Sequence, residues 1–241
     1  MSTPATSNEH EHDTDTLGLD DLDPWAMNLV LRVERDQPVL HDDLLAAAAL
    51  ATVSLLFDPR AEAQWKTAIE RWNQGRIRKL CRRARAAKWE QTASLDHVEV
   101  TVGTATLRAF VPCSVAKQPK ELSRLQLAGT DLDRTSPALP EGDVAYPQLR
   151  IWVNPALAMT SAKAAVQVAH GAQLALAQAP TQLRQAWLDA PSPSFEIRLA
   201  VADEWATDIC DDELVIRDAG FTEIAPNSMT CRARLLAAPS S

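Results

Sequence analysis

Residues 161–178 predict a helix that is apolar on nearly every side, and this feature constrains the fold more than any other. The stretch SAKAAVQVAHGAQLALAQ is dominated by Ala, Val, Leu and Gly. Such a helix is stable only when it is packed on most of its faces. Lys163, Gln167 and His170 are spaced i, i+4 and i+7, so they share one narrow stripe. That stripe either lines a cleft or faces solvent.

Strands and helices alternate around this helix, which predicts an α/β layer fold. Short β-type runs are expected at 149–153, 195–201, 213–217 and 229–235, and further helices at 181–189 and 203–212. The first half has a similar order. A strand at 27–33, a helix at 41–57, a Trp-bearing helical stretch at 61–88, a strand from His97 and a run to Val115 are expected there.

The order of elements suggests an internal duplication. The helix at 41–57 aligns with that at 161–178 at an offset of 120, and residues 100–114 align with 214–228 at an offset of 114, pairing Pro112 with Pro226. The alternative is that two small α/β units share this order by chance. The expected organisation is a disordered acidic arm at 1–24, a diverged α/β domain at 25–128, a Pro/Gly/acidic linker at 129–146 and a second domain at 147–241.

Charge is distributed unevenly along the chain. The formal net charge of −8, taken as a total, argues against a nucleic-acid partner, but seven acids and no base lie in residues 1–24. Residues 66–88 hold nine bases and one acid. This segment is either a solvated helix face or a surface that meets RNA phosphates.

A second group of polar residues follows the expected strand at 213–217. Asp218-Ala219-Gly220 is typical of a turn, and the hydroxyls of Thr222, Ser228 and Thr230 follow it around Pro226. These residues are either ordinary turn formers or, together with the stripe on the helix, parts of one site.

The two motifs together resemble the type II peptidyl-tRNA hydrolase family. K-x-x-x-Q-x-x-H in an Ala-rich helix, followed by D-A-G-x-T-x-I-x-P-x-S-x-T, carries the resemblance over about residues 147–235. It implies a cofactor-free α/β domain with a mixed four-stranded sheet between helical layers, here two such units in tandem. It also implies hydrolysis of the ester that joins a peptide to the terminal ribose of tRNA.

The site residues carried over by motif position divide into two groups. The expected catalytic residues are Lys163, Asp218 and Thr230, and the expected substrate-binding residues are Gln167, His170, Thr222 and Ser228. Asp218 is expected to orient or deprotonate water, and Lys163 to stabilise negative charge. No G-x-S-x-G elbow indicates a covalent route, so direct attack by water is preferred. The chain departs from the family at Ser161, where the family has a lysine.

The first half is expected to serve as a partner rather than as a second enzyme. At the offset of 120, Lys163, Gln167 and His170 fall on Asp43, Ala47 and Leu50. We expect this half to replace the second subunit of a dimer, with a homodimer as the alternative. Its basic segment is expected to contact tRNA through Arg78, Arg82 and Arg85.

Other classes of function are disfavoured. The chain has no expected membrane span or secretion signal, and its four dispersed cysteines indicate reduced thiols in a cytoplasmic protein. No metal or cofactor is expected. The alternatives to a peptidyl-tRNA hydrolase are a non-catalytic tRNA- or protein-binding relative and an esterase that acts on another acyl ester.

Overall fold

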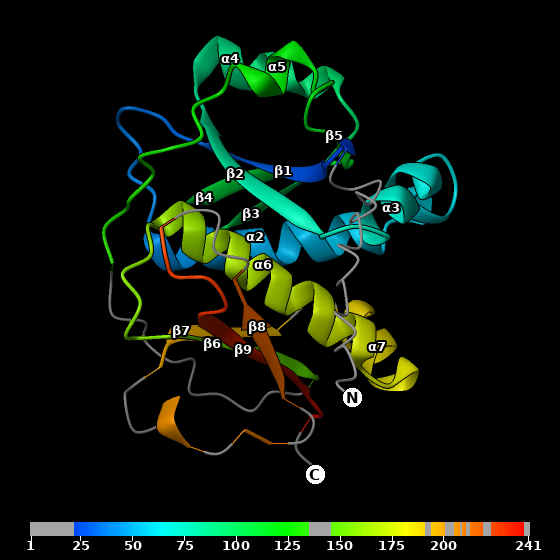
Figure 1. The fold of residues 1–241 in the computed structure, drawn as a ribbon, viewed down its shortest axis with the longest axis vertical. Coiled ribbons are helices and arrows are strands. Elements are labelled where there is room, and N and C mark those ends of the chain that lie inside the picture. Colours follow the sequence, from blue (N-terminus) through cyan, green and yellow to red (C-terminus); the bar gives the residue numbers. More distant parts are fainter. Residues whose placement is uncertain are drawn as a thin grey trace, which may run out of the picture.

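The computed structural model describes residues 22–134, 146–190, 194–200, 205–207, 209–210, 213–218 and 223–238. They form two α/β units, each built on a mixed sheet (Figure 1). The acidic arm expected at 1–24 and the linker expected at 129–146 lie mostly outside the described residues. Part of the arm is nevertheless placed, because Asp23 accepts hydrogen bonds from the side chains of Trp25 and Ser114.

The first unit is a sheet with one long helix on its inner face. Its strands are β1 (Trp25–Arg32), β2 (Arg78–Ala84), β3 (His97–Val102), β4 (Ala105–Phe110) and β5 (Cys113–Ser114). Its helices are α2 (His41–Leu56), α3 (Lys66–Asn73), α4 (Ala86–Gln91) and α5 (Lys120–Ser123), with 3-10 turns at Pro59–Glu62 and Thr92–Ser94. The short helices α4 and α5 lie on the outer face of the sheet (Figure 1).

The second unit is a four-stranded sheet with the Ala-rich helix packed on it. Its strands are β6 (Gln148–Val153), β7 (Ser194–Leu199), β8 (Leu214–Arg217) and β9 (Met229–Leu236), and its helices are α6 (Ser161–Gln178) and α7 (Thr181–Leu188). The expected bounds of α6 are confirmed. Thr160 caps the helix by accepting a hydrogen bond from the Lys163 N–H, and the chain turns extended at Ala179 before Pro180.

The two sheets have the same topology. Their strand orders are β2-β1-β4-β3 and β7-β6-β9-β8. In each sheet the first two strands in sequence are parallel and the other two pairings along this order are antiparallel. The first sheet has in addition the short strand β5, which pairs antiparallel with β1. The long helices α2 and α6 begin at His41 and Ser161, 120 residues apart.

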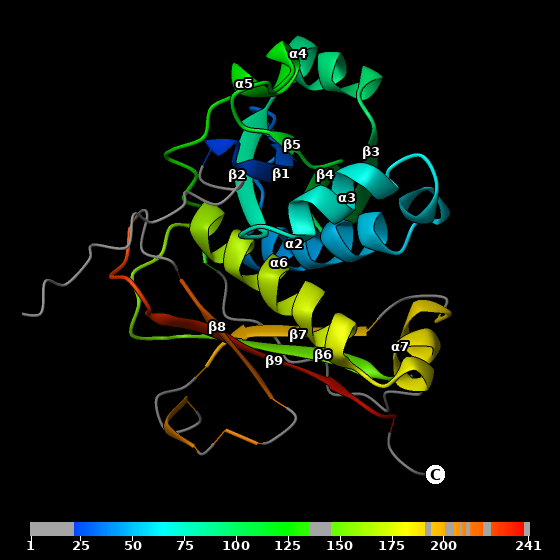
Figure 2. The same ribbon diagram turned by 45° about the vertical axis from the view of Figure 1, so that its right-hand side comes forward.

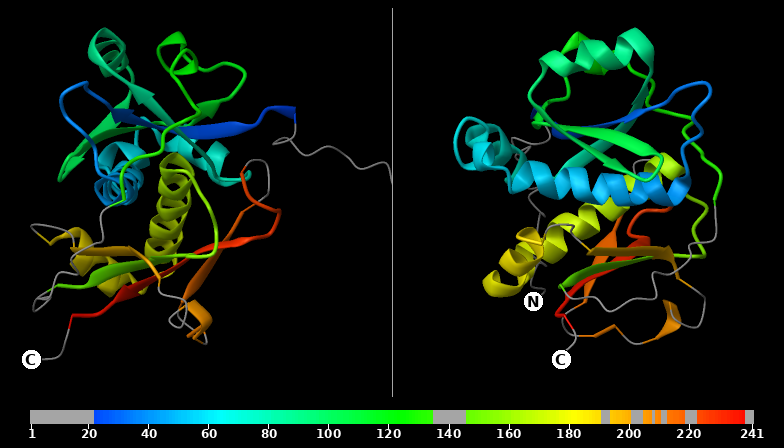
Figure 3. Two further views of the ribbon diagram at one scale, coloured as in Figure 1. Left: turned by 90° about the vertical axis from the view of Figure 1, so that its left-hand side faces the viewer. Right: turned by 180° about the vertical axis from the view of Figure 1, so that it is seen from behind.

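The helices α2 and α6 pack against each other between the two sheets, so the order of layers is sheet, helix, helix, sheet (Figures 2 and 3). This arrangement explains why both helices are apolar nearly all round: each has its own sheet on one side and the other helix on the opposite side. Small residues permit the close packing. A Cβ added at Gly171 of α6 would lie 3.2 Å from the Ala233 Cβ of β9.

The prediction of a helical stretch at 61–88 is wrong for residues 78–84. They form the strand β2, which pairs in parallel with β1 along its whole length. Buried Lys79 and Cys81 alternate with half-buried Arg78 and Leu80, which is the two-residue period of a strand rather than a helical one. Helix α3 ends at Asn73, just before Gly75.

The expected alignment of 100–114 with 214–228 holds only for the strands β3 and β8. Strands β3 and β4 are joined by the tight turn Gly103–Thr104, whereas β8 and β9 are separated by residues 218–228. Pro112 therefore follows β4, but Pro226 precedes β9, so the two prolines are not equivalent. Half of the acidic helix expected at 203–212 lies outside the described residues, and of the other half only residues 205–206 are helical. Within the described part of the chain, no helix is long and apolar enough to cross a membrane.

Candidate active site

Lys163 and Asp218 form an ion pair where α6 meets the end of β8. The Lys163 ammonium donates to Asp218 Oδ1, and the two side chains are only 12% and 8% exposed. The two residues are 55 positions apart in the chain. The fold therefore brings together the two motifs that sequence placed in separate segments, in a site with little access to bulk water.

Gln167 and Thr230 extend this contact into a hydrogen-bonded chain. The Gln167 amide donates to the same Asp218 Oδ1 at 2.9 Å, and the Thr230 hydroxyl donates to Gln167 Oε1 at 2.7 Å. Thr230 Oγ1 also lies 3.1 Å from the Ile216 carbonyl oxygen. Gln167 and Thr230 are buried. The Thr230 hydroxyl thus fixes the amide so that its NH₂ group faces Asp218.

The backbone holds Asp218 in place at the end of β8. Its N–H donates to the Ser228 carbonyl at 3.0 Å, and its own carbonyl accepts from the Asn227 N–H at 2.8 Å. Asn227 adopts φ 63°, a left-handed conformation that asparagine tolerates well. The Ser228 hydroxyl donates to the Ala225 carbonyl at 2.7 Å, so it closes a turn beside the site. Thr222 lies outside the described residues.

His170 faces the first unit rather than Asp218. Its Nδ1 lies 3.0 Å from the ammonium of Lys79, a buried residue of β2, and that ammonium also donates to Gln173 Oε1. Burial, reinforced by the positive charges of Lys79 and Lys163, lowers the pKa of His170 well below its ordinary value. His170 is therefore neutral near pH 7 and can accept the hydrogen bond from Lys79.

Lys79 has an unusual environment for a lysine. Burial lowers its pKa well below its ordinary value, and its ammonium lies 5.0 Å from the centre of the Trp72 ring. No carboxylate of the described residues pairs with it. Because the sequence analysis predicted a helix over this segment, it did not identify Lys79 as a residue of the site. Lys79 shares its face of the strand with Cys81 and Arg83, so no apolar alternation in the sequence marks that face as the inner one.

A pocket of about 250 Å³ lies between the units beside this site. Lys79 and Cys81 of β2 line one wall, and Lys163 of α6 lines the other. Residues 127–128 and Glu223 form further parts of the lining. Burial raises the pKa of Cys81 to about 12, so its thiol is not a nucleophile near neutral pH. Besides that thiol, the ionisable side chains that line the pocket are those of Lys79, Lys163 and Glu223. Asp218 is linked to the pocket through its contact with Lys163.

Ser161 occupies the position where the resembled family has a lysine. It is fully buried as the first residue of α6, and its hydroxyl oxygen lies 2.8 Å from His41 Nδ1, at the start of α2. The same oxygen accepts from the Leu132 N–H at 2.8 Å. In this chain the first unit and residues 131–132 cover the position.

The three arginines expected to contact tRNA lie in different environments. Arg82 is buried, and its guanidinium donates to Asn28 Oδ1, the Leu125 carbonyl and Gln118 Oε1. It therefore supports the packing of α5 on the sheet. Arg78 is half-buried, whereas Arg85 is exposed just after β2.

Comparisons of the chain with protein families, curated proteins and solved structures found no match.

Proposed function

We propose that the protein hydrolyses peptidyl-tRNA by direct attack of water on the ester bond. The observation that carries this proposal is the contact among Lys163, Gln167 and Asp218, which unites the two motifs that resemble the type II peptidyl-tRNA hydrolases. An ester hydrolase of this kind needs a base for water, a positive group for the developing oxyanion and a proton for the leaving oxygen.

The proposed reaction assigns one task to each side chain. The Asp218 carboxylate takes a proton from water as the water oxygen bonds to the ester carbonyl carbon. The Lys163 ammonium stabilises the oxyanion of the tetrahedral intermediate. The bond from that carbon to the ribose oxygen then breaks, and Asp218 returns the proton to the leaving oxygen. The products are the free peptide and tRNA.

Gln167 and Thr230 act in this proposal as positioning residues. The amide of Gln167 holds Oδ1 of Asp218, and the Thr230 hydroxyl holds that amide. The sequence motif suggested a catalytic role for Thr230. Its hydroxyl bonds instead to Gln167 and the Ile216 carbonyl, which supports a role one step removed from the reacting atoms.

We further propose that the first unit is a diverged copy of the second. Their identical strand orders and the spacing of 120 residues between α2 and α6 support this. Asp43 of α2, which takes the position of Lys163 at the offset of 120, accepts two hydrogen bonds from Thr104 in the turn after β3. Lys163 of α6 instead contacts Asp218 after β8. The tight turn at Gly103–Thr104 packs directly on Asp43 and leaves no room for a site like that at Lys163. A Cβ added at Gly103, which adopts φ 51°, would lie 2.4 Å from Asp43 Oδ2.

The divergence gives the first unit a supporting role in this proposal. It lacks the equivalents of Lys163 and Asp218, but it contributes Lys79 to the pocket and covers Ser161 through His41. The chain would then act as a pseudo-dimer, in which one unit catalyses and the other builds the surroundings of the site.

The test is release of peptide from purified peptidyl-tRNA by the full chain. Lys163→Met and Asp218→Asn should each lower turnover by about 100-fold or more. Matched changes at exposed sites of the first unit, Lys120→Met and Glu90→Gln, should leave it unchanged. No release above buffer by the unaltered chain would contradict the proposal, and comparable cleavage of simple acyl esters would favour a general esterase.

A further inference from the structure

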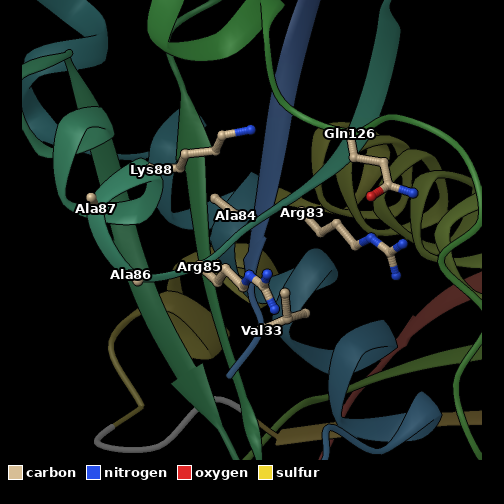
Figure 4. Close-up of a pocket in the computed structure, with 8 residues that line it drawn as sticks. All are labelled: Val33, Arg83, Ala84, Arg85, Ala86, Ala87, Lys88 and Gln126. Atoms are coloured by element: carbon tan, nitrogen blue, oxygen red, sulfur yellow. The ribbon is translucent and has the colours of Figure 1, made fainter. Parts of the chain in front are cut away.

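A second pocket, of about 640 Å³, opens at the end of β2 on the first unit (Figure 4). Three cationic side chains line it: Arg83 from β2, Arg85 from the junction and Lys88 from α4. Val33 and Gln126 form part of its remaining wall. None of the described residues that line it is acidic.

The side chains of the three cations have no other partner in the part of the chain that the structure describes. Among the described residues, no side-chain hydrogen bond, ion pair or ring contact is made by Arg83, Arg85 or Lys88. Arg108 of the same sheet, by contrast, is buried against Glu99 and Trp89. Three like charges around one concavity repel one another unless an anion lies between them, and guanidinium groups match the oxygens of a phosphate well.

The backbone at the junction is bent in a way that groups these charges. Ala86 adopts φ 45°, a conformation that is unfavourable for a residue with a Cβ. The bend turns the chain from β2 directly into α4, so that Arg85 and Lys88 line the same pocket as Arg83. Arg83 is also fixed by its backbone N–H, which donates to the Gln126 carbonyl at 3.0 Å.

This pocket and the pocket beside Lys163 follow one edge of the sheet. Gln126 lines the first, and Leu127 and Ala128 line the second. Strand β2 runs along both, from Lys79 to Arg83, a separation of about 13 Å at 3.3 Å per residue. A polyanion lying along β2 would thus pass from the three cations to the Lys163–Asp218 site.

We infer that the pocket of Arg83, Arg85 and Lys88 binds a backbone phosphate of the tRNA, in the strand that leads to the ester. The inference rests on the proposed function for the identity of the RNA. The pocket contributes affinity and not chemistry, because it lies away from Asp218. It therefore increases the affinity for substrates that carry the 3′ strand of tRNA and does not affect the hydrolysis of a minimal ester.

The experiment compares two ligands of different length with one triple variant. The first measurement is the affinity for an RNA minihelix that has a single-stranded 3′ end and carries no peptidyl group, taken at several salt concentrations. The second is the rate of hydrolysis of 3′-O-peptidyl adenosine. The variant is Arg83→Gln/Arg85→Gln/Lys88→Gln. A control of equal charge is Lys66→Gln/Lys117→Gln/Lys120→Gln, which changes exposed lysines outside the pocket.

The triple variant should bind the minihelix about tenfold more weakly. The slope of log affinity against log salt should fall by about 1 for each phosphate contact removed. Its hydrolysis of the minimal ester and its melting temperature should match the unaltered chain, and the control should keep the full affinity. Unchanged minihelix binding, an equal loss in the control, or an equal loss of minimal-ester hydrolysis would each overturn the inference.

Two further outcomes separate the related ideas. Inorganic pyrophosphate, at ionic strength matched with chloride, should displace the minihelix only weakly; complete displacement would assign the pocket to a small phosphate compound and overturn the inference. The unaltered chain could hydrolyse neither peptidyl-tRNA nor 3′-O-peptidyl adenosine and yet bind the minihelix through these three residues. In that case the proposed function fails while the phosphate site stands.

Discussion

The imidazole of His41 and the hydroxyl of Ser161 meet at 2.8 Å, and these residues are the first of α2 and α6. If the two units are copies, as proposed, these are equivalent positions. Equivalent residues that contact each other lie on the axis of a two-fold arrangement. The contact therefore marks where one half of the chain covers the other, close to the Lys163–Asp218 site.

Ser161→Lys, which introduces the lysine of the resembled family, should destabilise the protein by about 3 kcal/mol or more. Ser161 is fully buried, and a lysine there would place an unpaired charge beside His41. Urea unfolding measures the loss. Ser161→Ala, which only removes hydrogen bonds, should lose about 1 kcal/mol. A stable Ser161→Lys variant with raised turnover would show that the position is open to substrate.

His41 should make stability depend on pH. Burial, together with the charge of Arg134, lowers the pKa of His41 from 6.5 to about 4, and Asp131 opposes this. Between these values the unfolded chain binds a proton that the folded chain does not. The free energy of unfolding should therefore fall by about 3 kcal/mol as the pH is lowered from 6.5 to about 4.

The control for this pH effect is His41→Gln, measured by urea unfolding at several pH values. The other titratable groups are common to both proteins, so the difference between the two profiles isolates His41. The variant should show the flatter profile over this range. Two parallel profiles would contradict a buried, neutral His41.

The sequence predicted the second unit better than the first, for a physical reason. Helix α6 and strands β6 and β9 carry apolar patterns and clear ends at Thr160 and Pro180, so their bounds were close to the structure. Strand β2 was missed because its inner face carries Lys79 instead of an apolar residue. Its charges were attributed to a helix surface, although Arg82 is buried.

The candidate site shows a similar division. The spacing of Lys163 and Gln167 on one helix face was sufficient to group them, because helical geometry is local. Asp218 and Thr230 reach this helix face only because β8 pairs with β9. The prediction that all four residues form one site therefore depended on the family resemblance. The contact of His170 with Lys79 crosses between the units, and no local pattern contains it.

Gln167 and Thr230 should behave as one unit in turnover. Thr230→Val removes the donor to Gln167 Oε1, and Gln167→Met removes the donor to Asp218. Each should lower kcat by about tenfold with little change in KM, and the double variant should be little worse than either. Thr52→Val is a matched control, since the buried Thr52 hydroxyl has no hydrogen-bond partner among the described residues. Fully additive losses would contradict the proposed chain of contacts.

Lys79→Met should raise the pKa of His170. The positive charge of Lys79 is one of the causes that lower this pKa, after burial, so its removal relieves part of the effect. Burial remains, and the pKa should stay below 6.5. NMR titration of the His170 ring in the full chain measures the change, and Lys88→Met, at an exposed lysine, should leave it unaltered. If the pKa of His170 is the same in Lys79→Met as in the unaltered chain, the charge of Lys79 does not act on His170.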